Sequence, residues 1–106
     1  MARLPISFRQ RNRTTQEYRD QYAKLPRQIQ DLVRSACRLF DNNPQHPSLR
    51  HHELEDRKTG NQKPGSFSVS ITMQYRAIYV VGDDGANVWY WIGTHAEYKR
   101  FTGGKR

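Results

Sequence analysis

The sequence predicts a single α+β domain over residues 1–106, with two helices first, a mainly antiparallel sheet next and a short helix last. Two periodicities lead to this prediction. Apolar residues recur at the helical spacing of three and four through residues 26–40, and they alternate with polar residues through residues 66–73. The length of 106 residues suits one ordinary domain with one modest core.

Two consecutive helices are expected in the first half. Thr14-Thr15-Gln16-Glu17 is typical of a capping box and opens a helix that ends near Leu25. Pro26 suits the first turn of a second helix, which ends near Asp41. The tight joint between them predicts an antiparallel helical hairpin. Six apolar residues of the second helix form its predicted buried face: Ile29, Leu32, Val33, Ala36, Cys37 and Phe40.

The second half has the period of strands. Residues 66–73 alternate strictly, with Phe67, Val69, Ile71 and Met73 on a buried face and Ser66, Ser68, Ser70 and Thr72 on a wet one. Residues 75–81 predict the next strand of a hairpin, and Asp83-Asp84-Gly85 predicts a turn. Residues 88–92 are apolar or aromatic on both faces, as in a strand covered on both sides.

Three further elements complete the expected fold. Short strands are expected around Phe8, among Leu4 and Ile6, and at residues 49–54. Gly93 is expected to end the sheet. Thr94-His95-Ala96-Glu97 is a second capping box, which opens a short helix to about Phe101.

The charge of the chain lies at its two ends. Of the formal net charge of +8, residues 1–40 carry +6 and residues 94–106 carry +3, with −1 between them. Such an excess favours polyanionic partners, nucleic acid above all, although it also fits a plain basic surface or an acidic protein partner.

Composition excludes several classes of protein. No apolar run approaches the roughly 20 residues of a membrane span, and the N-terminus lacks a signal-peptide core, so we expect a cytoplasmic protein without membrane contact. The single cysteine, Cys37, excludes an internal disulfide and a cysteine-rich zinc site. We expect no metal and no cofactor.

The junction between the last strand and the last helix is a candidate site. His95 is followed by Tyr98 and Lys99 at spacings of three and four, so the three side chains share one helical face. The positive end of the helix disfavours the charged form of His95. A neutral imidazole accepts a proton, and tyrosine and lysine donate to phosphate oxygens. The alternative is that Thr94 and Glu97 only cap the helix while Tyr98 packs.

Arg76 is the only cation between Lys63 and Lys99. A lone arginine in a sheet must be paired or open to water. It forms either a structural ion pair with Glu53, Glu55 or Asp56, or a clamp for a phosphate.

A further polar group lies at residues 50–53. If this segment is a strand, Arg50 and His52 share one face and His51 the other. Adjacent histidines can bind a metal, but surface polarity explains them better because no second cluster of ligands accompanies them. His46, between Pro44 and Pro47, is expected in a loop.

These motifs, in this order and spacing, resemble the RelE/ParE toxin superfamily over residues 14–101. The resemblance rests on the two-helix start, the alternating strand, Tyr75-Arg76-Ala77-Ile78-Tyr79 and Trp91-Ile92-Gly93-Thr94-His95-Ala96-Glu97-Tyr98. It implies an α+β domain in which an N-terminal helical hairpin packs on a curved, mainly antiparallel sheet. It also implies a toxin of a type II toxin–antitoxin system, held inactive by a cognate antitoxin protein.

The resemblance implies a function and site residues as well. RelE-type members are mRNA endoribonucleases (mRNA interferases) that inhibit translation: they cut mRNA on the ribosome by helping the 2′-hydroxyl attack the adjacent phosphate, without a metal. Arg76 matches the arginine on the scissile phosphate, His95 a catalytic histidine and Tyr98 a nearby aromatic hydroxyl, though at a different offset. The lysine-rich central strand of RelE is absent, which leaves Arg50, His52 and Lys63 as substitutes, with Lys99 and Arg100 as further RNA-binding residues. ParE-type members instead inhibit DNA gyrase without catalysis, and this alternative stays open.

Overall fold

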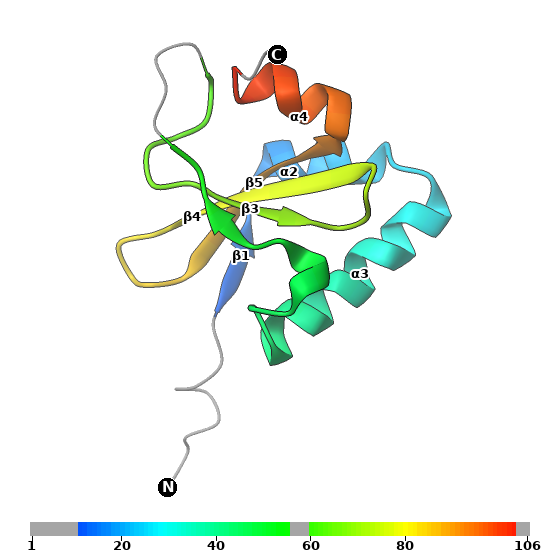
Figure 1. Cartoon of the computed structure of the whole chain (residues 1–106), viewed down its shortest axis with the longest axis horizontal. Helices are drawn as coiled ribbons and strands as arrows, with labels where there is room; N and C mark the ends of the chain where they lie inside the picture. The colour runs from blue at the N-terminus through cyan, green and yellow to red at the C-terminus, as the bar shows by residue number, and fades with distance from the viewer. Residues whose placement is uncertain (1–10, 56–59, 104–106) are drawn as a thin grey trace, which may run out of the picture.

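The fold is known from a computed structural model that describes residues 11–55 and 60–103, and it confirms the predicted α+β class (Figure 1). The strand expected around Phe8 lies outside the described residues. No helix in the described ranges is long and apolar enough to cross a membrane. The elements, in chain order, are β1 (Asn12–Thr14), α2 (Gln16–Ala23), α3 (Arg27–Asn42), the 3-10 helix η1 (Pro47–Leu49), β2 (His52–Glu53), β3 (Phe67–Ser70), β4 (Tyr75–Val81), β5 (Asn87–Thr94) and α4 (His95–Phe101).

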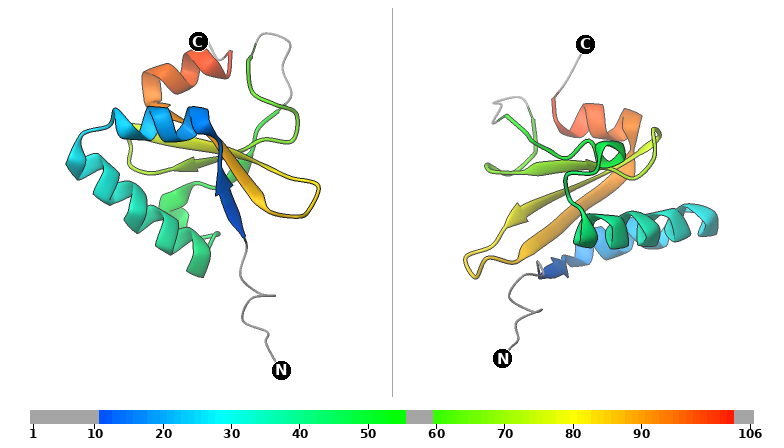
Figure 2. Two further views of the ribbon diagram at one scale, coloured as in Figure 1. Left: turned by 180° about the vertical axis from the view of Figure 1, so that it is seen from behind. Right: turned by 60° about the horizontal axis from the view of Figure 1, so that its bottom comes forward.

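The sheet has the strand order β1-β5-β4-β3-β2 and is antiparallel except at one edge, where β1 pairs with β5 in parallel. The predicted helical hairpin, α2 and α3, lies on one side of the sheet, and α4 lies across one end of the other side (Figures 1 and 2). The sheet therefore has two covered faces, and the helix that carries His95 stands apart from the hairpin.

The helical hairpin begins one residue later than predicted. Thr15, not Thr14, caps α2, because its hydroxyl accepts a hydrogen bond from the Tyr18 amide. The two helices are tied where they meet by Gln30 Nε2, which donates to the Tyr22 carbonyl over 3.0 Å. Only part of the predicted face of α3 is buried: Leu32 and Cys37 are exposed, while Val33, Ala36 and Phe40 are buried.

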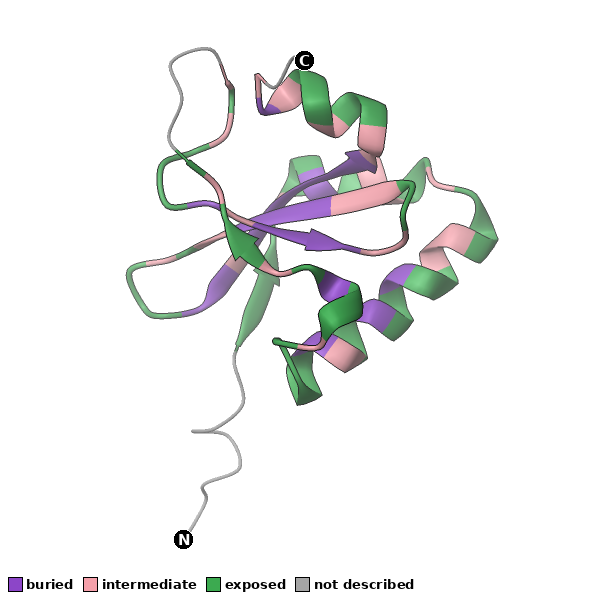
Figure 3. Cartoon of the chain, in the orientation of Figure 1, coloured by how far each residue is buried: buried purple, intermediate pink, exposed green. Residues whose placement is uncertain are grey.

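The prediction that the serines of residues 66–70 face water is wrong. Ser66, Ser68 and Ser70 are all buried, at 0%, 1% and 6% exposure (Figure 3). Their face carries a second core cluster, formed by Ile78, Tyr90 and Trp91, on which Leu54 packs together with Tyr98 and Phe101 of α4. Small hydroxyl side chains fit under this cover, and Ser66 Oγ satisfies its hydrogen bonding with the Lys63 carbonyl and the Tyr90 hydroxyl, each at 2.6 Å.

Two other expectations about strands are corrected. β3 ends at Ser70, so Met73 is not on a buried face but 75% exposed in the turn before β4. The strand expected at residues 49–54 is only two residues long, His52–Glu53, because Leu49 instead ends the 3-10 helix and is buried against the sheet.

The junction from β5 to α4 determines where the candidate residues lie. Thr94 and Glu97 form the predicted capping box, with both reciprocal hydrogen bonds present. Gly93 does not end the sheet, since it pairs with Arg76 inside it. A Cβ on Gly93 would lie 2.7 Å from Glu97 Oε1 and 2.9 Å from the Trp91 ring. Glycine therefore lets α4 fold back closely over β5.

Gly93→Ala is expected to lower the free energy of unfolding by about 1–3 kcal/mol, because the new methyl group overlaps the capping carboxylate and a packed indole. Urea denaturation measures this change. Gly82→Ala is the control, since its nearest neighbours would lie at 3.2 Å or more. Equal losses in the two variants would contradict the close approach.

Candidate functional site

Arg76 is held in a fixed orientation by the turn that precedes it. Its NH1 group donates to the carbonyls of Thr72, Met73 and Tyr75, at 2.8, 3.0 and 3.3 Å. The guanidinium is partly buried, which lowers its pKa, but an arginine stays charged at neutral pH. Three fixed carbonyls on one nitrogen leave the rest of the fork available to a ligand.

Arg76 has no acidic partner within residues 11–55 and 60–103. The predicted alternative of an ion pair with Glu53 or Glu55 is absent from these residues, and Asp56 lies outside them. Its neighbours are instead another cation, Arg50, whose charge also lowers the pKa of Arg76, and the Tyr98 ring at 6.0 Å from Arg76 Cζ. A partly buried cation without a carboxylate is typical of an anion site.

Tyr98 is close to both Arg76 and His95. The His95 and Tyr98 rings are nearly parallel, with centroids 6.2 Å apart. The amide of His95 donates to the Gln74 carbonyl over 2.7 Å, so the start of α4 is fixed to the turn beside Arg76. The structure thus brings together the three residues to which the family resemblance gives a catalytic role.

His95 is favoured in its neutral form. Partial burial lowers its pKa, and the positive charges of Arg76 and Lys99 lower it further. Its Nδ1 atom is buried and has no hydrogen-bond partner within the described residues. Because Nδ1 is buried, a group bound beside Arg76 would reach the neutral imidazole through Nε2, which can accept a proton from it when Nδ1 carries the ring proton.

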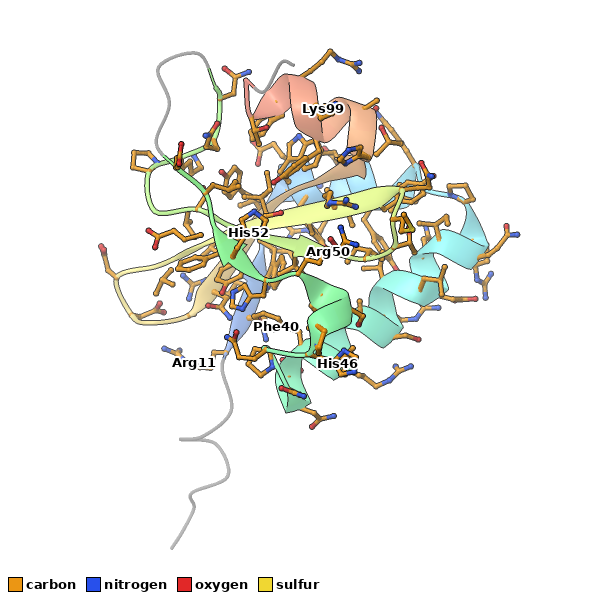
Figure 4. All side chains as sticks on the ribbon, in the orientation of Figure 1. Arg11, Phe40, His46, Arg50, His52 and Lys99 are labelled. Carbon is orange, nitrogen blue, oxygen red and sulfur yellow. The ribbon has the colours of Figure 1, made fainter. Side chains whose placement is uncertain are left out.

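Arg50 and His52 lie beside this group, at the front of the sheet in Figure 4. Arg50 has a left-handed backbone (φ +46°) at the end of η1, and its carbonyl accepts a hydrogen bond from His52 Nδ1 over 2.7 Å. A carbonyl cannot donate, so Nδ1 carries the proton and Nε2 of neutral His52 is an acceptor. His52 and Tyr98 line one hollow of about 310 Å³.

The remaining predicted RNA-binding residues are more dispersed. Lys99, labelled on α4 in Figure 4, is exposed and close enough to lower the pKa of His95. Arg100 lines a separate groove between α2 and α4, together with Lys24. Lys63 packs over the Tyr90 ring at 5.3 Å and lines a third hollow. The structure therefore does not bring Lys63 and Arg100 to Arg76.

The other histidines have structural contacts. His51 points to the hairpin side of the sheet, where its Nε2 lies 2.7 Å from the Tyr79 hydroxyl and its ring packs against Phe40. His46 Nδ1 accepts from the Ser48 amide and caps η1. No group of three or more metal-ligating side chains occurs in the described part of the chain.

Sequence reasoning missed two parts of the site. The carbonyls of the turn 72–75 orient Arg76, and Met73 lies exposed beside it. Polar and apolar residues alternate as far as Met73, so the sequence pattern did not show that β3 ends at Ser70. The only available signal was the polar Gln74, which separates the two strands.

Comparisons with known proteins identify the fold. No protein-family model matches the chain, and no curated protein matches its sequence. Among solved structures, YafQ from E. coli has a TM-score of 0.65 at 14% identity, covering 84% of this chain and 97% of that one. The YoeB/ParE toxin from Agrobacterium tumefaciens has a TM-score of 0.59 at 18% identity, covering 80% and 98%. RelE, in an archaeal RelE–RelB complex from Pyrococcus horikoshii, has 0.59 at 13%, covering 80% and 93%. The chain has the fold of these proteins.

Proposed function

We propose that this chain is a toxin of the RelE/ParE superfamily and cleaves mRNA on the ribosome. One observation carries the proposal: the free side of the Arg76 guanidinium lies beside Tyr98 and a neutral His95, with no carboxylate paired to it among the described residues. The shared fold and the net charge of +8 support it.

The reaction assigns a separate task to each group. The ribose 2′-hydroxyl attacks the adjacent phosphorus, and His95 accepts the proton that it loses. Arg76 binds the non-bridging oxygens, whose negative charge grows in the transition state. The bond to the 5′-oxygen breaks, and this oxygen takes a proton from the Tyr98 hydroxyl or from water. The products are a 2′,3′-cyclic phosphate and a 5′-hydroxyl.

The mRNA and the ribosome are the proposed polyanionic partners. Arg50 and Lys99 flank Arg76 and His95 and add positive charge along the path of the RNA backbone. Nε2 of His52 is an acceptor and can bind a ribose hydroxyl or exchange a proton with a group bound in the hollow that His52 shares with Tyr98. Lys63 and Arg100 would contact RNA only beyond the reacting nucleotides.

A cognate antitoxin is the second proposed partner. Solved complexes of similar fold pair DinJ with YafQ and RelB with RelE. Here the outer side of the hairpin is exposed, and residues 16–42 carry five cations against four acids, a net charge of +1. An exposed, mixed-charge surface of this kind suits a partner segment that folds as it binds. Co-expression with the neighbouring reading frame should recover a stable complex, and a folded chain that ignores that product contradicts the idea.

Primer extension on ribosome-bound mRNA tests the catalytic proposal. Purified protein should produce new cuts inside the reading frame only when ribosomes occupy the mRNA, and the cut ends should carry a cyclic phosphate. An intact mRNA at saturating protein overturns the proposal.

The alternative is a ParE-type inhibitor of DNA gyrase. The similar fold of the YoeB/ParE toxin supports this alternative, but a shared fold does not determine function. A supercoiling assay distinguishes the two: inhibited supercoiling with uncut mRNA would establish the alternative, and normal supercoiling at saturating protein would exclude it.

A further inference from the structure

A hollow of about 440 Å³ lies beside Arg76; Tyr98 is not among its lining residues, and the proposed reaction does not use it. Arg50 and Arg76 form its charged walls. Its other walls come from η1 and from the turn between β3 and β4: Pro47, Ser48, Ser70, Ile71, Thr72 and Met73. Its volume is in the range of small-ligand sites, so one nucleobase fits.

The polar atoms of this hollow offer both kinds of hydrogen bond. Ser48 Oγ lies 2.9 Å from His46 Nδ1, which also accepts from the Ser48 amide, so the hydroxyl donates to the ring and keeps its lone pairs. Thr72 Oγ1 accepts from the Gln74 amide over 3.0 Å and keeps its proton. One acceptor and one donor suit the edge of a base better than a second phosphate.

Met73 gives the hollow an apolar wall that is open to solvent. It is 75% exposed, the most exposed of the large hydrophobic residues in the described chain. Its carbonyl is fixed by Arg76, so its position is tied to the proposed phosphate site. A flexible, polarisable thioether makes favourable contacts with aromatic rings.

We infer that this hollow holds the base of a nucleotide next to the phosphate bound by Arg76, with Met73 against the face of the base. The inference rests on the proposed function for the identity of the ligand. Its geometric reason is that Arg76 is a wall of the hollow, so a backbone phosphate on the free side of its guanidinium places the neighbouring base at the opening.

The Met73 methyl group provides a direct measurement, because Met1 is the only other methionine. In protein labelled with methyl-13C methionine, a 2′-O-methyl trinucleotide, which cannot be cleaved, should shift the Met73 resonance upfield and leave that of Met1 unchanged. Inorganic phosphate at equal concentration should not reproduce the shift. An unmoved Met73 resonance at millimolar trinucleotide overturns the inference, whether or not the protein cleaves mRNA.

Cleavage by variants gives the second measurement. Met73→Ala should lower kcat/KM on ribosome-bound mRNA by about tenfold, through KM, and should broaden the choice of base at the cut, since stacking on a side chain is lost. Met73→Leu should retain most activity. Val81→Ala, an exposed hydrophobic at the other end of β4, is the matched control. If the wild type cleaves mRNA and Met73→Ala cleaves it at the same rate and with the same base preference, the inference is contradicted but the proposed function is not. If the wild type is inactive, the proposed function is contradicted.

Discussion

Replacing Arg76 by alanine is expected to reduce mRNA cleavage at least 100-fold. The variant loses the one guanidinium that is oriented by three backbone carbonyls and has no acidic partner among the described residues. Removing a single oriented donor from a developing oxyanion typically costs about 10²–10³ in rate. The measurement is the rate of appearance of the cut product on programmed ribosomes under single-turnover conditions.

Two further variants make this result specific. Arg76→Lys keeps the charge but not the planar fork, so we expect only a small part of the activity to return. Arg27→Ala removes a cation that is 83% exposed on the hairpin and should leave the rate unchanged. Circular dichroism and thermal melting establish that each variant is folded. Wild-type activity in folded Arg76→Ala would remove Arg76 from the mechanism.

Replacing His95 by glutamine is expected to lower the cleavage rate about 10²–10⁴-fold, the usual contribution of a positioned proton acceptor. Glutamine cannot take up a proton at neutral pH. His46→Gln is the control, because this histidine caps η1 in a loop. If His95 only packs against Tyr98, glutamine at this position should leave the rate within a few-fold of the wild type.

The pH dependence distinguishes the role of His95 as base from a role as acid. Burial, Arg76 and Lys99 place its pKa below the ordinary value of 6.5. An acceptor must be unprotonated, so the single-turnover rate should rise with pH below that lowered pKa and be level by pH 7. The His95→Gln variant should lack this rise. A wild-type rate that falls as pH increases through the same range would make His95 the proton donor instead.

The sequence predicted most of the fold because strong periodicity reports local structure. The range of β4 was predicted correctly at both ends, and the capping box of α4 was predicted with both of its partners. What failed depended on a distant element. Alternation shows that Ser68 faces away from Val69, but only the placement of distant segments, among them Leu54 and α4, determines that the second face of the sheet is covered as well.

The residues of the candidate site were predicted one by one, but their proximity to each other in the fold was not predicted. Arg76 stood out as an isolated cation and His95 as the first residue of a helix. Their proximity follows from the register that pairs Arg76 with Gly93, which no local pattern reveals. For the same reason the sequence did not reveal that Lys63 and Arg100 lie away from Arg76. Both are basic, and they line other hollows.

The pair of cations Arg50 and Arg76 also bears on how folding and binding are coupled. Arg50 is near enough to lower the pKa of Arg76, and neither forms an ion pair with an acid among the described residues, so their repulsion opposes folding. A bound polyanion relieves this repulsion only in the folded chain. A bound polyanion therefore stabilises the folded protein, and the melting temperature should rise as the concentration of the polyanion increases.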